Sequence, residues 1–128
     1  MPTVSDYMTR DPLCIQDHET LLVAHAIMRK HHIRHLPVLD DRQRLVGVVS
    51  ERDLHLLETL HSVDPGREPV SQAMTEHPYS VSPDASLAQV AQEMQNQKYG
   101  SAVVVEGGRV VGLFTTTDAL RALAQMAR

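Results

Sequence analysis

The chain has 128 residues, of which 42% are hydrophobic and only 3% aromatic, and its formal net charge is −4 with histidine neutral. This length suffices for one compact domain with an aliphatic core or for two small halves that share one, and the hydrophobic fraction excludes a disordered polymer. The negative charge argues against a nucleic-acid partner bound through a general basic surface. One cysteine, Cys14, excludes an intramolecular disulfide and a multi-thiolate metal site within one chain.

The first residues, MPTVSDYMTRDP, are polar and charged early, so they contain no apolar core of a signal peptide. No apolar run approaches the length of a membrane span. We therefore expect a cytoplasmic protein with no membrane partner.

The first predicted elements are a short leader that ends at the pair Met8-Thr9 and a brief strand at Cys14 to Gln16. An amphipathic helix comes next, because apolar residues recur at helical spacing. Its predicted buried face consists of Leu21, Ala24, Ile27 and Met28.

Two short runs rich in β-branched residues follow, HLPVLD from His35 and RLVGVV from Arg44, with turn residues between them. They predict a pair of strands. A second amphipathic helix is expected to begin at Ser50. The predicted order is therefore β-α-β-β-α.

The same order then occurs a second time. VSQAMTEHPYSV from Val70 repeats VSDYMTRDPLCI from Val4 at an offset of 66, and Asp118 follows Asp53 by 65. The stretch ETLHSVDPGREP, with two prolines and a glycine, predicts a linker. We assign repeat 1 to residues 1–60, the linker to 61–69 and repeat 2 to 70–128.

In the second copy we predict a strand at Ser80 to Ser82 and a helix capped by Ser86, with Gln89 completing a capping box. Gly107-Gly108 predicts a tight hairpin turn, since glycine tolerates positive φ. A last helix is expected to begin at Thr115. Each repeat is too small to bury enough surface alone, so we expect the two to pack as one body. The predicted buried face of the first helix of this copy consists of Leu87, Val90, Ala91 and Met94.

The segments GVVSERD from Gly47 and GLFTTTD from Gly112 stand at equivalent places in the two copies. One interpretation is a helix cap, with a hydroxyl at the N-cap and an acid in the first turn. The strand glycines point in addition to a close approach by another backbone or by a ligand. The sharper interpretation is a nucleotide site, in which the helix N-terminus holds a phosphate and Asp53 accepts hydrogen bonds from both ribose hydroxyls.

These motifs, MT…P…HLPVLD…LVGVVSERD and MT…P…SAVVVEGGRVVGLFTTTD, resemble a tandem pair of CBS domains, also called a Bateman module. The resemblance covers almost the whole chain. It implies an α+β fold in which two β-α-β-β-α repeats pack around a pseudo-twofold axis. It also implies clefts for an adenosine ligand such as AMP, ADP, ATP or S-adenosylmethionine, with no cofactor required.

The resemblance further implies which residues contact the ligand. Phosphate and ribose contacts would come from Ser50 and Asp53 in one cleft and from Thr115 and Asp118 in the other. The leader of the opposite repeat, near Thr9 or Thr75, would close each cleft. Residues at the strand starts would flank the base or phosphate, namely Arg34, His35, Tyr99 and Ser101.

The two sites are predicted to be unequal. Copy one places Arg52 beside Asp53, whereas copy two places Thr117 beside Asp118. A fixed positive charge favours phosphorylated ligands more than a hydroxyl does. The alternative is that Arg52 points to solvent or pairs with a neighbouring acid.

Histidines at His31, His32 and His35 raise the alternative of a metal site, but His31 and His32 should point apart at a helix end. We expect His25 on the outer face of its helix and Cys14 as a small strand residue. No GxSxG, HExxH or GxxxxGK[ST] motif is present, so we do not expect an enzyme.

The hypothesis from the sequence is a non-catalytic regulatory module that binds an adenosine nucleotide and acts in trans on a protein effector. The alternatives are a structural dimerisation module with empty clefts and a histidine-based metal or redox sensor. A homodimer is expected because two outer helix faces are rich in apolar residues. Those faces are predicted to carry Leu54, Leu57 and Leu60 in copy one and Leu120, Leu123 and Ala127 in copy two.

Overall fold

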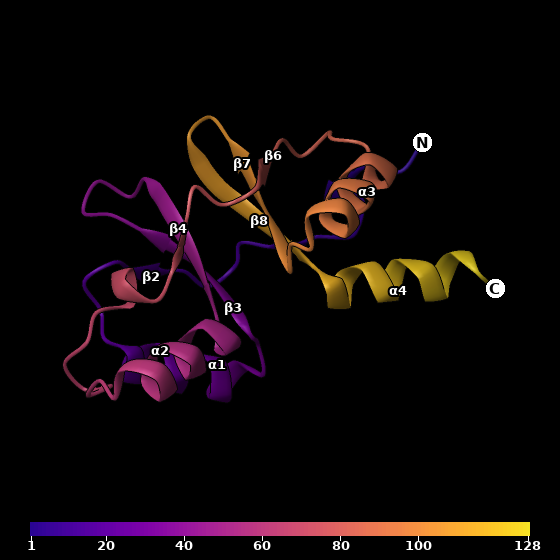
Figure 1. The fold of residues 1–128 in the computed structure, drawn as a ribbon. Coiled ribbons are helices and arrows are strands. Elements are labelled where there is room, and N and C mark those ends of the chain that lie inside the picture. Colours follow the sequence, from indigo (N-terminus) through magenta and orange to yellow (C-terminus); the bar gives the residue numbers. More distant parts are fainter. The chain divides into compact units, whose positions relative to one another are not determined.

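A computed structural model describes all residues from 1 to 128 (Figure 1). The chain forms two compact units. The Asp53 unit is Leu13–Pro78, and the Asp118 unit combines Met1–Pro12 with Tyr79–Arg128. The boundaries of the units differ from those of the repeats. The first residues of repeat 1 belong to the Asp118 unit, and the first residues of repeat 2 belong to the Asp53 unit.

The Asp53 unit contains a four-stranded sheet in the order β2-β3-β4-β5. The first pair, β2 and β3, is parallel, and the other two pairs are antiparallel. The strands are β2 (Ile15–Gln16), β3 (His35–Leu39), β4 (Leu45–Ser50) and β5 (Thr75–Glu76). The helical elements of this unit are α1 (Leu21–His31), α2 (Glu51–His61) and the 3₁₀ turn η2 (Val70–Gln72).

Helix α1 begins where the Thr20 hydroxyl accepts a hydrogen bond from the Val23 amide at 3.3 Å. It ends at His32, which adopts the left-handed conformation with φ of 56°. Its apolar face packs on the sheet as the 3.6-residue period predicts. Leu21 and Ala24 are fully buried and Met28 is nearly so, while Ile27 packs at the edge of the same core.

The Asp118 unit repeats this arrangement with a sheet in the order β1-β8-β7-β6. Here β6 and β7 are parallel, and β1 and β7 each pair antiparallel with β8. The strands are β1 (Thr9–Arg10), β6 (Ser80–Val81), β7 (Ser101–Glu106) and β8 (Arg109–Thr115). The helical elements are the 3₁₀ turn η1 (Val4–Asp6), α3 (Leu87–Gln97) and α4 (Thr116–Met126).

Helix α3 is capped by the Ser86 hydroxyl, which accepts a hydrogen bond from the Gln89 amide at 3.3 Å. The reciprocal bond from Gln89 that a full capping box requires is absent, so that part of the prediction is wrong. Leu87, Val90 and Met94 are buried as expected. Ala91 is exposed, because it lies one residue beyond the narrow face that meets the sheet.

The hairpin between β7 and β8 turns at Gly107 and Gly108, with φ of 59° and 78°. Positive φ at both central residues is the conformation that glycine adopts without steric cost, and the predicted tight turn is confirmed. The two predicted leading strands are each one residue shorter than expected, ending the pairing at Ile15–Gln16 and Ser80–Val81.

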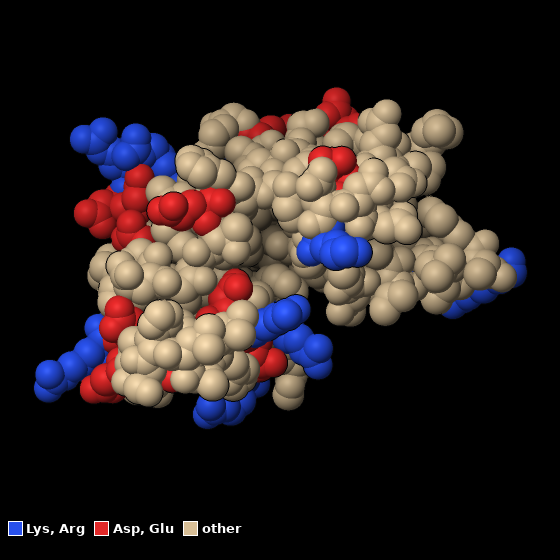
Figure 2. Space-filling model, in the orientation of Figure 1, with Lys and Arg blue, Asp and Glu red and all other residues tan.

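The expected apolar outer faces are only partly present. Leu54 is fully buried and Leu57 packs against the same core, so neither belongs to an outer face. Leu60 on α2 is 71% exposed, and on α4 Leu120 and Leu123 are 66% and 61% exposed. In Figure 2, charged side chains cover little of α4 on the face shown.

The chain is therefore a mixed α+β protein built from two strand-and-helix repeats. None of its helices combines the length and the apolar character that crossing a membrane requires.

Candidate functional site

The Gly-x-x-Ser-x-x-Asp segment of the Asp53 unit ends β4 and starts α2. The Ser50 hydroxyl accepts a hydrogen bond from the Asp53 amide at 3.1 Å, and Asp53 Oδ2 accepts one from the Ser50 amide at 2.8 Å. This is a complete capping box, so the helix-cap interpretation is confirmed. The box fixes both side chains at the N-terminus of α2.

Gly47 lies in β4 under the leader of the second repeat. A Cβ atom at Gly47 would lie 2.6 Å from Met74 Sδ and 2.9 Å from the Thr75 carbonyl oxygen. Strand β5, which begins at Thr75, pairs with β4 at this point. The predicted close approach is therefore made by Met74 and the backbone of Thr75.

Gly112 has the same role in the Asp118 unit. A Cβ atom there would collide with the side chain of Met8, whose Cγ and Cε atoms would each lie 3.0 Å away. Thr9 and Arg10 pair with Leu113 and Gly112 of β8. In both units the Met-Thr leader of one repeat thus lies across the glycine of the other.

The Asp118 carboxylate is buried, with only 6% of its side chain exposed, and both of its oxygens are engaged. Oδ2 accepts hydrogen bonds from the Thr115 amide at 3.0 Å and the Thr115 hydroxyl at 3.4 Å. Oδ1 accepts from the Thr9 hydroxyl at 3.5 Å and from Arg121 Nη2 at 3.1 Å. Arg121 also donates to the Tyr7 carbonyl oxygen, so it ties α4 to the leader.

The sequence interpretation missed Arg121. Its position, one turn after Asp118 on α4, was the available signal, since side chains three residues apart on a helix are neighbours.

The Asp53 carboxylate accepts fewer hydrogen bonds than the Asp118 carboxylate. Its Oδ2 is held by the Ser50 amide, whereas its Oδ1 accepts no hydrogen bond. The residue of copy one that corresponds to Arg121 is Leu56, which is 46% exposed and has no charge to offer. Arg52 is exposed and makes no ion pair, so of the two forms of the alternative the structure agrees with an arginine that points to solvent and not with a pair to a neighbouring acid.

His35 and Arg34 lie beside this capping box. His35 pairs with Ser50 across β3 and β4, and the Arg34 carbonyl oxygen accepts a hydrogen bond from the Glu51 amide at 2.9 Å. Burial lowers the pKa of His35, the nearby Asp53 charge opposes this and Arg34 adds to it. The Asp53 unit therefore places a histidine that favours its neutral form beside a carboxylate.

In the Asp118 unit the residue equivalent to His35 is Ser101, and an aromatic residue, Tyr99, precedes it by two positions. Ser101, which is 7% exposed, pairs with Thr115 as His35 pairs with Ser50. Tyr99 stacks on Tyr79, with ring centroids 5.2 Å apart and an interplanar angle of 28°. Burial, followed by the charge of Glu93, raises the pKa of Tyr79.

Each unit by itself thus contains six of the twelve predicted ligand residues. The Asp53 unit holds Arg34, His35, Ser50, Arg52, Asp53 and Thr75, and the Asp118 unit holds Thr9, Tyr99, Ser101, Thr115, Thr117 and Asp118. The sequence interpretation also missed Tyr79, whose ring stacks on that of Tyr99. Three of the predicted ligand residues are exposed and form no hydrogen bond with the two aspartates, namely Arg52, Thr75 and Thr117.

Of the remaining histidines, His25 is placed differently from the prediction, whereas His31 and His32 lie at the end of α1 as expected. His25 does not lie on an outer face: its side chain is 17% exposed, and Nε2 lies 3.0 Å from Glu58 Oε1 on α2. Its ring also contacts that of His55, with centroids 5.4 Å apart. His31 ends α1 and His32 caps it, and they form no convergent metal-binding group with His35.

Comparison with known proteins identifies the repeats. The sequence matches the CBS domain family at residues 4–57 and 70–125. Hypoxic response protein 1 of Mycobacterium tuberculosis is 30% identical over 127 residues, which cover 99% of this chain and 89% of that protein. A solved structure of Hypoxic Response Protein I, described with two coordinated zinc ions, superposes with a TM-score of 0.82 at 28% identity and covers 94% of this chain and 98% of that chain.

Two further solved structures contain adenosine ligands. CBSX2 in complex with AMP is 30% identical and has a TM-score of 0.83, and the match covers 100% of both chains. The CBS domain pair of protein MJ0100, in complex with 5′-methylthioadenosine and S-adenosyl-L-methionine, is 25% identical with a TM-score of 0.86, covering 95% of this chain and 99% of that one. Two family matches, relatives of similar length and the same fold agree with one another, and the chain therefore belongs to the CBS domain family, with two CBS domains in tandem.

Proposed function

We propose that this protein is a non-catalytic regulatory module that binds an adenosine nucleotide at the N-termini of α2 and α4. The observation that carries the proposal is the pair of Ser/Thr-x-x-Asp segments, each fixed at a helix N-terminus beneath a Met-Thr leader. The complexes of CBSX2 with AMP and of MJ0100 with methylthioadenosine and S-adenosylmethionine support adenosine compounds as the ligand class. AMP, ADP, ATP and S-adenosylmethionine are the candidates.

The proposed Asp53 site uses each side chain for one contact. The amides of Ser50, Glu51 and Asp53 are already engaged, so the Arg52 amide and the Ser50 hydroxyl are the groups suited to a phosphate. Asp53 Oδ1, which accepts no hydrogen bond from the protein, is suited to a ribose hydroxyl. Arg34 and Arg52 add positive charge near the phosphate, and the remaining contacts of this site come from His35 and Thr75.

The proposed Asp118 site differs in its free groups. Thr9, Thr115 and Arg121 already occupy both oxygens of Asp118, so a ribose must displace one of these donors. The stacked ring of Tyr99, which is 41% exposed, offers a flat surface for a purine. Ser101 and Thr117 complete this site with hydroxyl groups. We infer that the Asp53 site binds the ribose more tightly than the Asp118 site.

The regulatory output is proposed to act in trans, on a protein effector in the cytoplasm, with the module as a homodimer. The competing function is a structural dimerisation module whose nucleotide sites stay empty. The two functions differ in one property, because only a sensor gains stability from the nucleotide.

A thermal-shift series on nucleotide-stripped protein separates them. AMP, ADP, ATP and S-adenosylmethionine are each added at up to millimolar concentration, with guanosine monophosphate as the base control. A ligand at a hundred times its Kd stabilises the folded state by about 2.7 kcal/mol, which raises the Tm by several degrees. The variant Asp53→Ala/Asp118→Ala should lose this response. If no adenosine compound raises the Tm of the parent, the dimerisation module is the correct function.

A further inference from the structure

Three side chains of the Asp53 unit that take no part in the proposed nucleotide site lie together at one edge of its sheet. Asp17 and His18 directly follow β2, and Asp41 lies in the turn between β3 and β4. Because β2 and β3 are parallel, their carboxyl ends meet at the same edge, and the Asp17 amide donates to the Leu39 carbonyl oxygen at 2.9 Å. The backbone therefore fixes two distant segments side by side.

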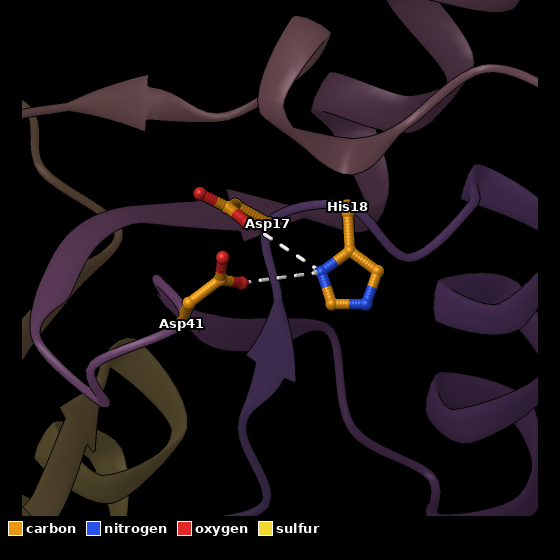
Figure 3. A group of neighbouring side chains, drawn as sticks. All are labelled: Asp17, His18 and Asp41. Atoms are coloured by element: carbon orange, nitrogen blue, oxygen red, sulfur yellow. Dashed lines mark ion pairs between the residues drawn. The ribbon is translucent and has the colours of Figure 1, made fainter.

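The three side chains converge on one point (Figure 3). His18 Nδ1 lies 3.7 Å from Asp17 Oδ1 and 3.9 Å from Asp41 Oδ1. One potential ligand atom from each residue lies within 4.8 Å of the other two. Both His18 distances exceed a hydrogen bond but lie within the range of an ion pair, so the imidazole nitrogen faces two carboxylate oxygens without a hydrogen bond to either.

The three ligand atoms lie somewhat farther apart than the ligands of a bound metal ion. Ligand bonds of about 2.0–2.1 Å in a tetrahedral zinc site place the ligand atoms roughly 3.3 Å apart. Small side-chain rotations, of a few tenths of an ångström at the ligand atoms, would bring the His18 contacts to that spacing. No other group of three or more His, Cys, Asp or Glu side chains in the chain converges in this way.

The chemistry of the ligand set selects the class of ion. One imidazole nitrogen and two carboxylate oxygens favour Zn²⁺ or a neighbouring late transition metal, whereas Ca²⁺ and Mg²⁺ prefer oxygen ligands alone. With the imidazole neutral, the two carboxylates carry a charge of −2, which one divalent cation balances. The His18 and Asp41 side chains are 66% and 90% exposed, so a further coordination position remains open to water.

The turn that presents Asp41 is held by its neighbour. The Asp40 carboxylate accepts hydrogen bonds from the amides of Arg42 and Arg44 at 2.9 Å each and from Arg44 Nε at 2.8 Å. These bonds lower the pKa of Asp40, with the Arg44 amide as the largest cause. Asp40 is therefore committed to the turn, and Asp41 is left for a ligand.

We propose that Asp17, His18 and Asp41 form a surface site for one late first-row divalent cation such as Zn²⁺, independent of nucleotide binding. The site is of the three-ligand kind that keeps a position open, in which a donor from water or from another molecule completes the coordination.

The test is competition for Zn²⁺ between a chromophoric chelator and the metal-free full-length protein at pH 7.5. The parent should take up one Zn²⁺ per chain, and His18→Ala and Asp41→Asn should each weaken its affinity by ten-fold or more. His31→Ala and Glu106→Gln remove an exposed histidine and an exposed acid elsewhere and should leave it unchanged. Circular dichroism confirms that all four variants remain folded, and excess Ca²⁺ or Mg²⁺ should not displace the Zn²⁺.

The pH dependence of the zinc affinity provides a second test on the same proteins. A ligating imidazole must be neutral, so the zinc affinity of the parent should fall as the solution is acidified towards pH 5.5. The proposal is overturned if His18→Ala binds Zn²⁺ as tightly as the parent does. It is also overturned if His31→Ala alone loses the ion or if the parent binds none at micromolar concentration.

Discussion

Met74 lies so close above Gly47 that a single added methyl group would collide with its sulfur atom, at 2.6 Å. The same relation holds between Met8 and Gly112. The Met-Thr leader and the strand glycine are therefore two halves of one packing arrangement. This relation explains why each repeat carries both features.

The first prediction concerns these glycines. Gly112→Ala should lower the free energy of unfolding by about 1–3 kcal/mol, because the extra methyl group overpacks the contact with Met8. The double variant Gly112→Ala/Met8→Ala should recover most of the loss caused by the added methyl group, relative to Met8→Ala alone, because the three nearest atoms to that position all belong to the Met8 side chain. Urea denaturation of the four proteins measures the coupling.

Gly47→Ala provides the contrast. There the Thr75 carbonyl oxygen would also lie within 2.9 Å of the new Cβ, and a backbone atom cannot be trimmed. Met74→Ala should therefore rescue Gly47→Ala only in part. Gly66→Ala, whose nearest atom would be 3.4 Å away, is the matched control and should be close to neutral. Equal losses for all three glycines would contradict the packing explanation.

The second prediction concerns Arg52 and phosphate. Hydrogen bonds to charged groups contribute roughly 1.5–3 kcal/mol, against about 1 kcal/mol for neutral ones. Arg52→Ala should thus weaken ATP binding at the Asp53 site by about ten-fold or more and leave adenosine nearly unchanged. Isothermal titration calorimetry with both ligands, on the parent, Arg52→Ala and Asp53→Ala, measures this. Equal loss for ATP and adenosine would show that Arg52 does not contact the phosphate.

The third prediction concerns Arg121. Arg121→Leu, which copies Leu56 of the other repeat, removes the shorter of the two hydrogen bonds to Asp118 Oδ1 and leaves only the 3.5 Å bond from Thr9, so a ribose hydroxyl gains room at that oxygen. In the background of Asp53→Ala, where only the Asp118 site remains, Arg121→Leu should strengthen AMP binding by several-fold or more. Calorimetry compares it with Arg109→Leu, which removes an exposed arginine of the same unit. If Arg121→Leu in this background binds AMP as tightly as before or less tightly, Arg121 does not compete with the ligand.

The fourth prediction concerns pH. Burial lowers the pKa of His35 in the folded state, so the unfolded chain binds this proton more readily. The contribution of His35 to stability is therefore intact above the ordinary histidine pKa of about 6.5 and is lost as the pH falls below it. Urea unfolding between pH 8 and pH 5 should show a smaller decline for His35→Gln than for the parent. His31→Gln, at an exposed position, should decline as the parent does.

The fifth prediction concerns self-association. Leu120 and Leu123 are exposed on α4, and paired apolar residues of this kind are typical of an interface. The double variant Leu120→Gln/Leu123→Gln should be a monomer at a micromolar concentration at which the parent is a dimer. The Tm of this monomer should be no lower than that of a monomeric parent chain. Light scattering measures the mass, and Leu60→Gln on α2 tests whether the other exposed helix takes part. A parent that is monomeric at the same concentration would contradict the prediction.

The sequence was sufficient for the repeat, for the β-α-β-β-α order within each copy and for the caps at Ser50 and Thr115, because periodic apolar residues and capping side chains act locally. It did not predict that the Met-Thr leaders form β1 and β5, because these strands depend on pairing with the distant strands β8 and β4. It was misleading at Leu54 and Ala91, where the width of the buried face depends on which sheet residues the helix meets. His25 was placed on the wrong side for the same reason, since its partner Glu58 is 33 residues away. Arg121 and Tyr79 were missed because their roles depend on contacts with the leader and with another ring.

The division of the chain into units has a consequence for how the protein can be cut. Leu13–Pro78 is continuous, whereas the rest of the fold is completed by the two ends of the polypeptide. In effect one domain is inserted into another, between Pro12 and Tyr79. A truncation that removes the first twelve residues would take away Met8 and Thr9, and so would damage the surroundings of an aspartate more than a hundred positions downstream.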